Sequence, residues 1–134
     1  MPHVSKRKLD KLKEEELVHS FNLVLAKISN EKEMQDFLGS LLTITERVML
    51  AKRLAIAILL KEGISQNRIS SALNVTQATV SRMQLFLEVR GQGYNIAFKK
   101  LISEKILAEF KKYLLKLASY SIRAAGGYVK PEII

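Results

Sequence analysis

Hydrophobic residues recur at helical spacing along most of this chain. The first stripe covers about residues 10–28 and consists of Leu17, Phe21, Leu25 and Ile28. Residues three or four positions apart share one face of an α-helix, so this segment is predicted to be an amphipathic helix. Proline occurs at positions 2 and 131 and nowhere between them, so no proline has to break a helix in the interior. The pattern predicts an all-α fold.

Two further helices are signalled by their N-terminal caps. Asn30 is followed three residues later by Glu33, and Thr43 is followed three residues later by Glu46. In this spacing the first side chain accepts a hydrogen bond from a backbone amide of the first turn, and the glutamate can return one. The helix after Thr43 is apolar on more than one face until Gly63, where we expect it to end. Such a helix belongs at the centre of the fold.

Two short helices are predicted next, over about residues 65–73 and 76–89, with a tight turn between them. A longer amphipathic segment is expected over about residues 94–122, after Gly91 and Gly93. We interpret these two glycines as a hinge or a helix stop.

Length and composition favour one folded domain. The chain has 134 residues, of which 48% are hydrophobic, enough to bury a core. We expect a flexible basic N-terminus over residues 1–9, a single helical domain over 10–122 and a tail over 123–134. Every apolar run is shorter than the roughly 18 to 20 residues of a membrane span, and the charged N-terminus does not resemble a secretion signal. A cytoplasmic location with no membrane partner is expected.

The charge of the chain indicates an anionic partner. Lysine and arginine number 22 against 13 aspartates and glutamates, which gives a net charge of +9. Such a balance favours nucleic acid, and an anionic membrane surface is the alternative. With no cysteine and two histidines, the sequence offers no disulfide and no metal site, and no cofactor is expected. His19 lacks a partnering catalytic pattern, so we do not expect an enzyme.

The segment from Ser65 to Gln84 meets the packing requirements of a helix-turn-helix. Ser70 provides a small residue where the first helix passes closest to the second, and Asn74 provides a turn residue that tolerates a positive φ. The residues that then close a small apolar core are Ile69, Leu73, Val75 and Val80. A plain helical hairpin with a solvated polar face is the alternative interpretation.

The outer side of the second helix is predicted to read DNA. Once Val80 is turned toward the core, the helical projection turns Ser81 and Arg82 outward. Serine, glutamine and arginine can hydrogen-bond base edges or phosphates, and an alanine methyl can touch thymine. No acid occurs in residues 65–87, which suits an approach to phosphates. The candidate DNA-binding residues are Gln66, Asn67, Arg68, Thr76, Gln77, Ala78, Thr79, Ser81 and Arg82.

Residues 41–87 resemble the tryptophan repressor family. The resemblance rests on Leu-Leu-Thr-Ile-Thr-Glu-Arg at 41–47, Lys-Arg at 52–53, Leu-Leu-Lys-Glu-Gly-Ile-Ser-Gln at 59–66 and Ala-Thr-Val-Ser-Arg at 78–82. It implies an intertwined homodimer that presents two helix-turn-helix motifs, here called reading heads, to successive major grooves of DNA. The implied function is sequence-specific binding of double-stranded DNA by a transcriptional regulator, acting as a repressor.

The resemblance also implies an effector pocket between the helix before the motif and the reading helix. Thr43, Arg53 and Arg82 stand at the matching positions, although Arg53 can equally be a surface charge. Where the tryptophan repressor keeps small residues after the reading-helix arginine, this chain has Met83 and Phe86. Two bulky apolar side chains would fill the space of an indole. Regulation without tryptophan is therefore expected, and the small-molecule effector is not specified by the sequence.

Two basic clusters have more than one interpretation. The last helical segment carries Lys99, Lys100, Lys105, Lys111, Lys112 and Lys116. These side chains could contact phosphates or a membrane surface, or they could form a solvated helix face. The cluster within residues 6–13 could be an arm on DNA. The alternative function for the whole chain is a helical protein-interaction or membrane-peripheral module without specific DNA binding.

Overall fold

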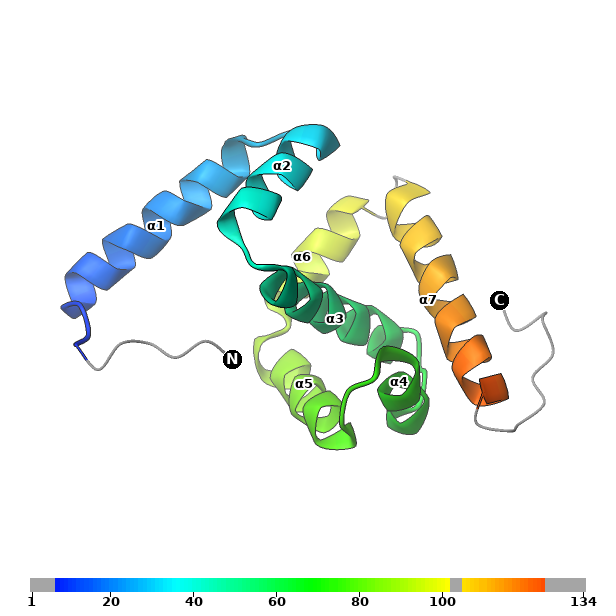
Figure 1. Cartoon of the computed structure of the whole chain (residues 1–134). Helices are drawn as coiled ribbons and strands as arrows, with labels where there is room; N and C mark the ends of the chain where they lie inside the picture. Colours follow the sequence, from blue (N-terminus) through cyan, green and yellow to red (C-terminus); the bar gives the residue numbers. More distant parts are fainter. Residues whose placement is uncertain (1–6, 102–104, 125–134) are drawn as a thin grey trace. The chain divides into compact units, whose positions relative to one another are not determined.

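The computed structural model in Figure 1 describes residues 7–101 and 105–124, and for residues 101 and 120–124 it describes the backbone. Every regular element in these ranges is an α-helix, which confirms the all-α fold. The seven helices are α1 (Lys11–Lys27), α2 (Glu31–Leu41), α3 (Ile44–Lys61), α4 (Gln66–Leu73), α5 (Gln77–Arg90), α6 (Gln92–Leu101) and α7 (Lys105–Ala124).

The chain divides into two compact units, Met1–Arg47 and Val48–Ile134, with the division inside α3. The extent of the predicted domain, residues 10–122, stays a prediction. The predicted basic terminus and the predicted tail lie largely outside the described residues.

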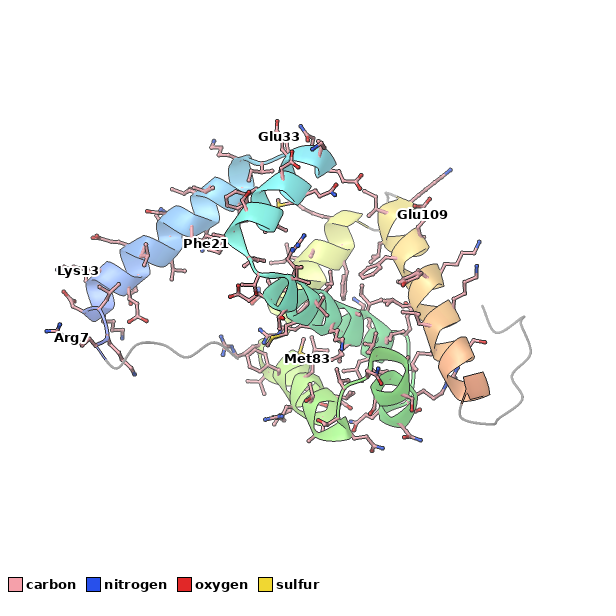
Figure 2. All side chains as sticks on the ribbon, in the orientation of Figure 1. Arg7, Lys13, Phe21, Glu33, Met83 and Glu109 are labelled. Atoms are coloured by element: carbon pink, nitrogen blue, oxygen red, sulfur yellow. The ribbon has the colours of Figure 1, made fainter. Side chains whose placement is uncertain are left out.

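The first unit contains α1, α2 and the start of α3, and its helices begin where their caps predict. The Asn30 side chain accepts from the backbone amide of Glu33 at 2.8 Å, and the Asp10 side chain accepts from that of Leu12 at 3.2 Å. No residue of α1 or α2 is buried, and Phe21 is 44% exposed (Figure 2). Of the predicted apolar stripe of the first helix, Leu17 and Phe21 are exposed, and Leu25 and Ile28 are half-buried.

The second unit has a core built around the C-terminal half of α3. Five consecutive residues, Ala55–Leu59, are buried, and five successive helical positions point in all directions around the axis. The other helices contribute Ile69, Leu73, Val80, Met83, Phe98, Leu107 and Leu114 to the same cluster. This confirms the central place predicted for the helix. Its N-terminal half differs, because Val48 and Leu50 remain about half exposed.

The two helix ends next to this core depend on glycine. Gly63 adopts a φ of 81° just after α3, as expected for the residue that terminates it. Gly91 is buried at the corner between α5 and α6, where a Cβ atom would lie 2.2 Å from the carbonyl oxygen of Leu87. Gly91 therefore agrees with the predicted helix stop, whereas Gly93 lies within α6 and does not.

The predicted single segment over residues 94–122 is wrong in one respect. The structure contains two helices, α6 and α7, on either side of residues 102–104. The apolar pattern continues from Leu101 to Ile106, and the sequence between them has neither glycine nor proline. Periodicity therefore could not indicate the division.

Candidate nucleic-acid interface

The helix-turn-helix forms where the sequence predicts it, and its turn depends on Asn74 and Ser70. Asn74 has a φ of 54° and is the one non-glycine residue with a positive φ among the described residues. Asparagine tolerates this left-handed conformation better than most side chains do. The Ser70 hydroxyl donates to the carbonyl oxygen of Val75 at 2.5 Å, while the amide of Val75 donates back to the Ser70 carbonyl at 3.1 Å. Ser70 therefore ties the turn together in addition to being small.

Both helices of the motif begin with an N-cap residue, and neither helix has an acidic residue in its first turn. The Ser65 side chain accepts from the amide of Arg68 at 3.3 Å at the start of α4. The Thr76 side chain accepts from the amide of Thr79 at 3.1 Å at the start of α5, and the two threonine hydroxyls lie 2.9 Å apart. The remaining amides at these ends add partial positive charge on the predicted DNA side.

The inner side of the motif is packed as predicted. Ile69 and Val80 have no exposed surface, and Leu73 is also buried. Val75 is half-buried against the same core. Burying these side chains fixes which way α5 faces, because the opposite side of a helix must then be solvent-exposed.

The structure joins the candidate residues of α4 and α5 through a side-chain network. The Ser81 hydroxyl donates to Oε1 of Gln66 at 2.7 Å, and Nε2 of Gln66 donates to Oε1 of Gln84. Nε2 of Gln77 donates to Oδ1 of Asn67 at 3.0 Å. The N-terminal turns of α4 and α5 therefore form one polar surface.

Gln84 was not among the predicted site residues. It follows Ser81 by three positions and so shares a face of α5 with it, which is the sequence signal that could have identified it.

The exposure of the candidate residues fits a reading surface. Ala78 and Arg82 are exposed together with Asn67, Gln77 and Ser81. Thr76 is exposed as well, whereas Gln66 and Thr79 are half-buried. The surface thus presents amide, hydroxyl, methyl and guanidinium groups to solvent, which are the groups that can contact base edges and phosphates.

Arg68 departs from this arrangement. Its Nε and Nη2 atoms are buried and have no hydrogen-bond partner among the described residues. A buried guanidinium nitrogen without a partner is unfavourable, because it has lost water and gained nothing in exchange. In this conformation Arg68 does not present its full hydrogen-bonding edge to a ligand.

The residues of the predicted effector pocket are divided between the two units of the chain. Arg53 and Arg82 belong to the second unit, and Thr43 belongs to the first, so their meeting in one pocket stays a prediction. Thr43 takes part in the predicted capping box: its amide donates to Oε1 of Glu46 at 2.8 Å, and its hydroxyl accepts from the amide of Glu46 at 3.1 Å. The hydrogen bond from the Thr43 amide to the Glu46 carboxylate is the main cause of a lowered pKa of that carboxyl, and a hydrogen bond to it from the Thr43 side chain lowers the pKa further.

The two bulky residues after Arg82 behave differently. Met83 is buried in the core, as the helical projection predicts (Figure 2). Phe86 is 49% exposed, and the Arg90 guanidinium carbon lies 4.7 Å from the centre of its ring. Phe86 therefore does not fill the core as Met83 does. Three helical positions turn Phe86 about 60° away from Met83, to a flank where Arg90 covers it.

Arg53 lies near Tyr94 of α6. Burial raises the pKa of the Tyr94 hydroxyl, and the positive charge of Arg53 opposes that shift. Arg53 is thus exposed yet close to the core.

Other kinds of site have little support. Within residues 7–101 and 105–124, no three histidine, aspartate or glutamate side chains lie close enough to hold a metal ion. In the same part of the chain, each helix is too short or too polar to cross a membrane.

Comparison with known proteins relates these features to one family. The family model described as Trp repressor protein matches residues 16–102, which include the whole helix-turn-helix. "Uncharacterized protein YerC" of Bacillus subtilis (strain 168) is 32% identical over 93 residues, covering 69% of this chain and 88% of that protein. No solved structure matches the chain. Both matches extend well beyond the helix-turn-helix, and the chain therefore belongs to the Trp repressor family.

Proposed function

We propose that the protein is a transcriptional regulator that binds specific sequences of double-stranded DNA through α4 and α5. The observation that supports this proposal most strongly is the network of hydrogen bonds between the two helices, in which Ser81 bonds to Gln66 and Gln77 bonds to Asn67. The motif that holds this network has no acidic residue. This surface combines groups that discriminate bases with a positive helix terminus that attracts phosphates. Family membership supports the same function.

We further propose that the protein acts as a homodimer. Helix α1 leaves its apolar side chains exposed, including Leu17 and Val24, and α2 buries none of its own. Covering an exposed leucine or phenylalanine stabilises an assembly by about 1.5–3 kcal/mol per side chain. A second copy of the chain offers the same apolar surface, and two-fold pairing would set two reading heads about 34 Å apart along the duplex.

Regulation is proposed to be repression that does not require tryptophan. Met83 occupies the core beneath the reading helix, where the family resemblance would place the indole. Phe86 and Arg90 stack at the flank of the same helix and restrict access from that side. The protein is proposed to act in the cytoplasm, where it would meet DNA.

The first experiment is selection of bound sequences from a random duplex pool, followed by mobility shifts at several salt concentrations. The proposal expects one enriched sequence with two related half-sites and an affinity that falls steeply with salt. Recovery of no preferred sequence, or binding that salt does not change, would contradict it. A protein-interaction module would show neither property.

The second experiment assigns the reading surface. Ser81→Ala and Gln77→Ala are expected to change discrimination at particular bases, whereas Arg82→Ala is expected to weaken binding to all duplexes alike. Lys32→Ala is a suitable control, because Lys32 pairs with Asp36 on the exposed surface of the first unit. A calorimetric titration with free tryptophan is expected to show no saturable binding.

A further inference from the structure

Helix α7 is an addition to the part of the chain that the family model matches. That match ends at residue 102, and α7 begins at Lys105. A helix of 20 residues is about 30 Å long. Its role has to be argued from its own contacts.

These contacts attach α7 to the helix-turn-helix. The helix packs mainly against α4, the first helix of the motif, and also against α6 (Figure 1). Its inner side is buried through Leu107, Leu114, Ala118 and Ser119. An ion pair of 2.7 Å between Lys111 and Glu62 adds a link to the end of α3, and both side chains are about one-third exposed. We therefore treat α7 as part of the same rigid unit as α4.

The outer side of α7 is positively charged. Lys105, Lys112 and Lys116 are exposed. Glu109, which is labelled in Figure 2, is the one acid among residues 105–119. Lys112 and Lys116 are four positions apart and so lie one above the other on the same face. Within the described part of the chain, neither lysine forms an ion pair that would neutralise it, in contrast to Lys111.

We propose that α7 belongs to the DNA-binding head and that Lys112 and Lys116 bind backbone phosphates flanking the bases read by α5. This inference rests on the proposed function. Helix α4 supplies Gln66 and Asn67 to the reading surface at its N-terminus and contacts α7 along its body. Helix α7 therefore lies beside the motif, on the side of α4 away from α5 (Figure 1). Lysine is suited to this task because it meets phosphate as a mobile point charge.

Charge and packing favour DNA over an anionic membrane. A helix that binds a membrane surface inserts its apolar face among the lipids. The inner apolar residues of α7, Leu107, Leu114 and Ala118, are already buried, while Ile106 and Tyr113 stay exposed. Two exposed apolar side chains offer a membrane less than a whole apolar face would, whereas the exposed lysines match the regular negative charge of a duplex.

The test uses the full chain with two double variants of equal charge. Lys112→Gln with Lys116→Gln removes the outer lysines of α7. Lys99→Gln with Lys100→Gln removes two exposed lysines of α6 and is the matched control. Each protein is titrated, over a range of salt, against a selected duplex of about 40 base pairs and against one cut to about 20 base pairs, enough for two half-sites. Ser81→Ala is measured on the same duplexes, and circular dichroism checks that every variant is folded.

The α7 variant is expected to bind the long duplex about tenfold more weakly at low salt. The slope of log affinity against log salt should become shallower by about two per protomer. The loss should be equal for selected and unrelated sequences and should disappear on the short duplex. The α6 control should bind as the unchanged chain does.

Three results would overturn the inference. These are an unchanged salt slope, an equal loss in the α6 control, and a loss that does not depend on duplex length. Reduced binding to phosphatidylserine vesicles with intact DNA binding would assign the lysines to a membrane instead. If Ser81→Ala alters sequence preference while the α7 variant changes nothing, this inference fails and the proposed function stands. If the unchanged chain binds no duplex, both fail.

Discussion

Replacing Gly91 by alanine is expected to destabilise the protein, whereas the same replacement at Gly93 is expected to stabilise it. A Cβ at position 91 would lie 2.2 Å from the carbonyl oxygen of Leu87, and 3.1 and 3.2 Å from two further backbone atoms of that residue. Because the obstacle is backbone, it cannot move aside by changing a rotamer. The corner between α5 and α6 has to open by about 1 Å to restore ordinary contact distances.

The expected cost for Gly91→Ala is about 2 to 3 kcal/mol, toward the upper part of the range for overpacked sites. For a chain of this size that cost lowers Tm by about 10 °C. Gly93 lies within α6 and has nothing within 4 Å of its would-be Cβ. Gly93→Ala therefore gains about 0.5 to 1 kcal/mol from helix propensity.

The assay is urea unfolding followed by circular dichroism, at a fixed protein concentration because unfolding of the proposed dimer would depend on it. The decisive quantity is the difference between the two variants, since both add the same methyl group two residues apart. A Gly91→Ala variant as stable as Gly93→Ala would refute the reasoning. It would mean that the backbone between α5 and α6 can shift to make room for the Cβ atom at little energetic cost.

Four further substitutions test three other positions. Asn74→Gly should leave the free energy of unfolding nearly unchanged in urea titrations, while Asn74→Val should lower it by about 1 to 2 kcal/mol, because the φ of 54° suits glycine and not a branched side chain. Arg68→Met should keep or raise the melting temperature by removing buried donors without partners, and calorimetry that shows a large loss would contradict their unpaired state. The pKa of Glu46 is lowered in the folded chain, so its stabilising effect is present above the ordinary pKa of 4.5 and is lost as pH falls through the lowered value. Glu46→Gln should flatten that part of the stability profile in acid titrations.

The sequence predicts most of what depends on local chemistry. The caps at Asn30 and Thr43 form because a side-chain oxygen and a backbone amide are brought together by the helix itself. The left-handed Asn74 is a similar case, since few residues other than glycine accept that conformation. The buried half of α3 was predictable because its apolar residues cover more than one face.

Features that depend on contacts between helices were not predicted. The separation of α6 from α7 leaves no mark in the apolar pattern, and the exposure of Phe86 depends on Arg90 one turn later. The burial of two nitrogens of Arg68 could not be read from a residue type that is usually solvated. The link between Gln66 and Gln84 joins residues 18 positions apart and needs the crossing of α4 and α5. A one-dimensional pattern contains none of this geometry.

The bonds that join Gln66 to Ser81 and Gln84 also affect how the recognition code can change over evolution. Each of these side chains is oriented by the others before DNA arrives, so a substitution at one of them alters the rotamers offered by the remaining two. The energetic effects of substitutions within such a set do not add. Under the proposed function, the sequence preference of a variant with all three positions replaced would therefore differ from the one that its single variants, such as Ser81→Ala, predict.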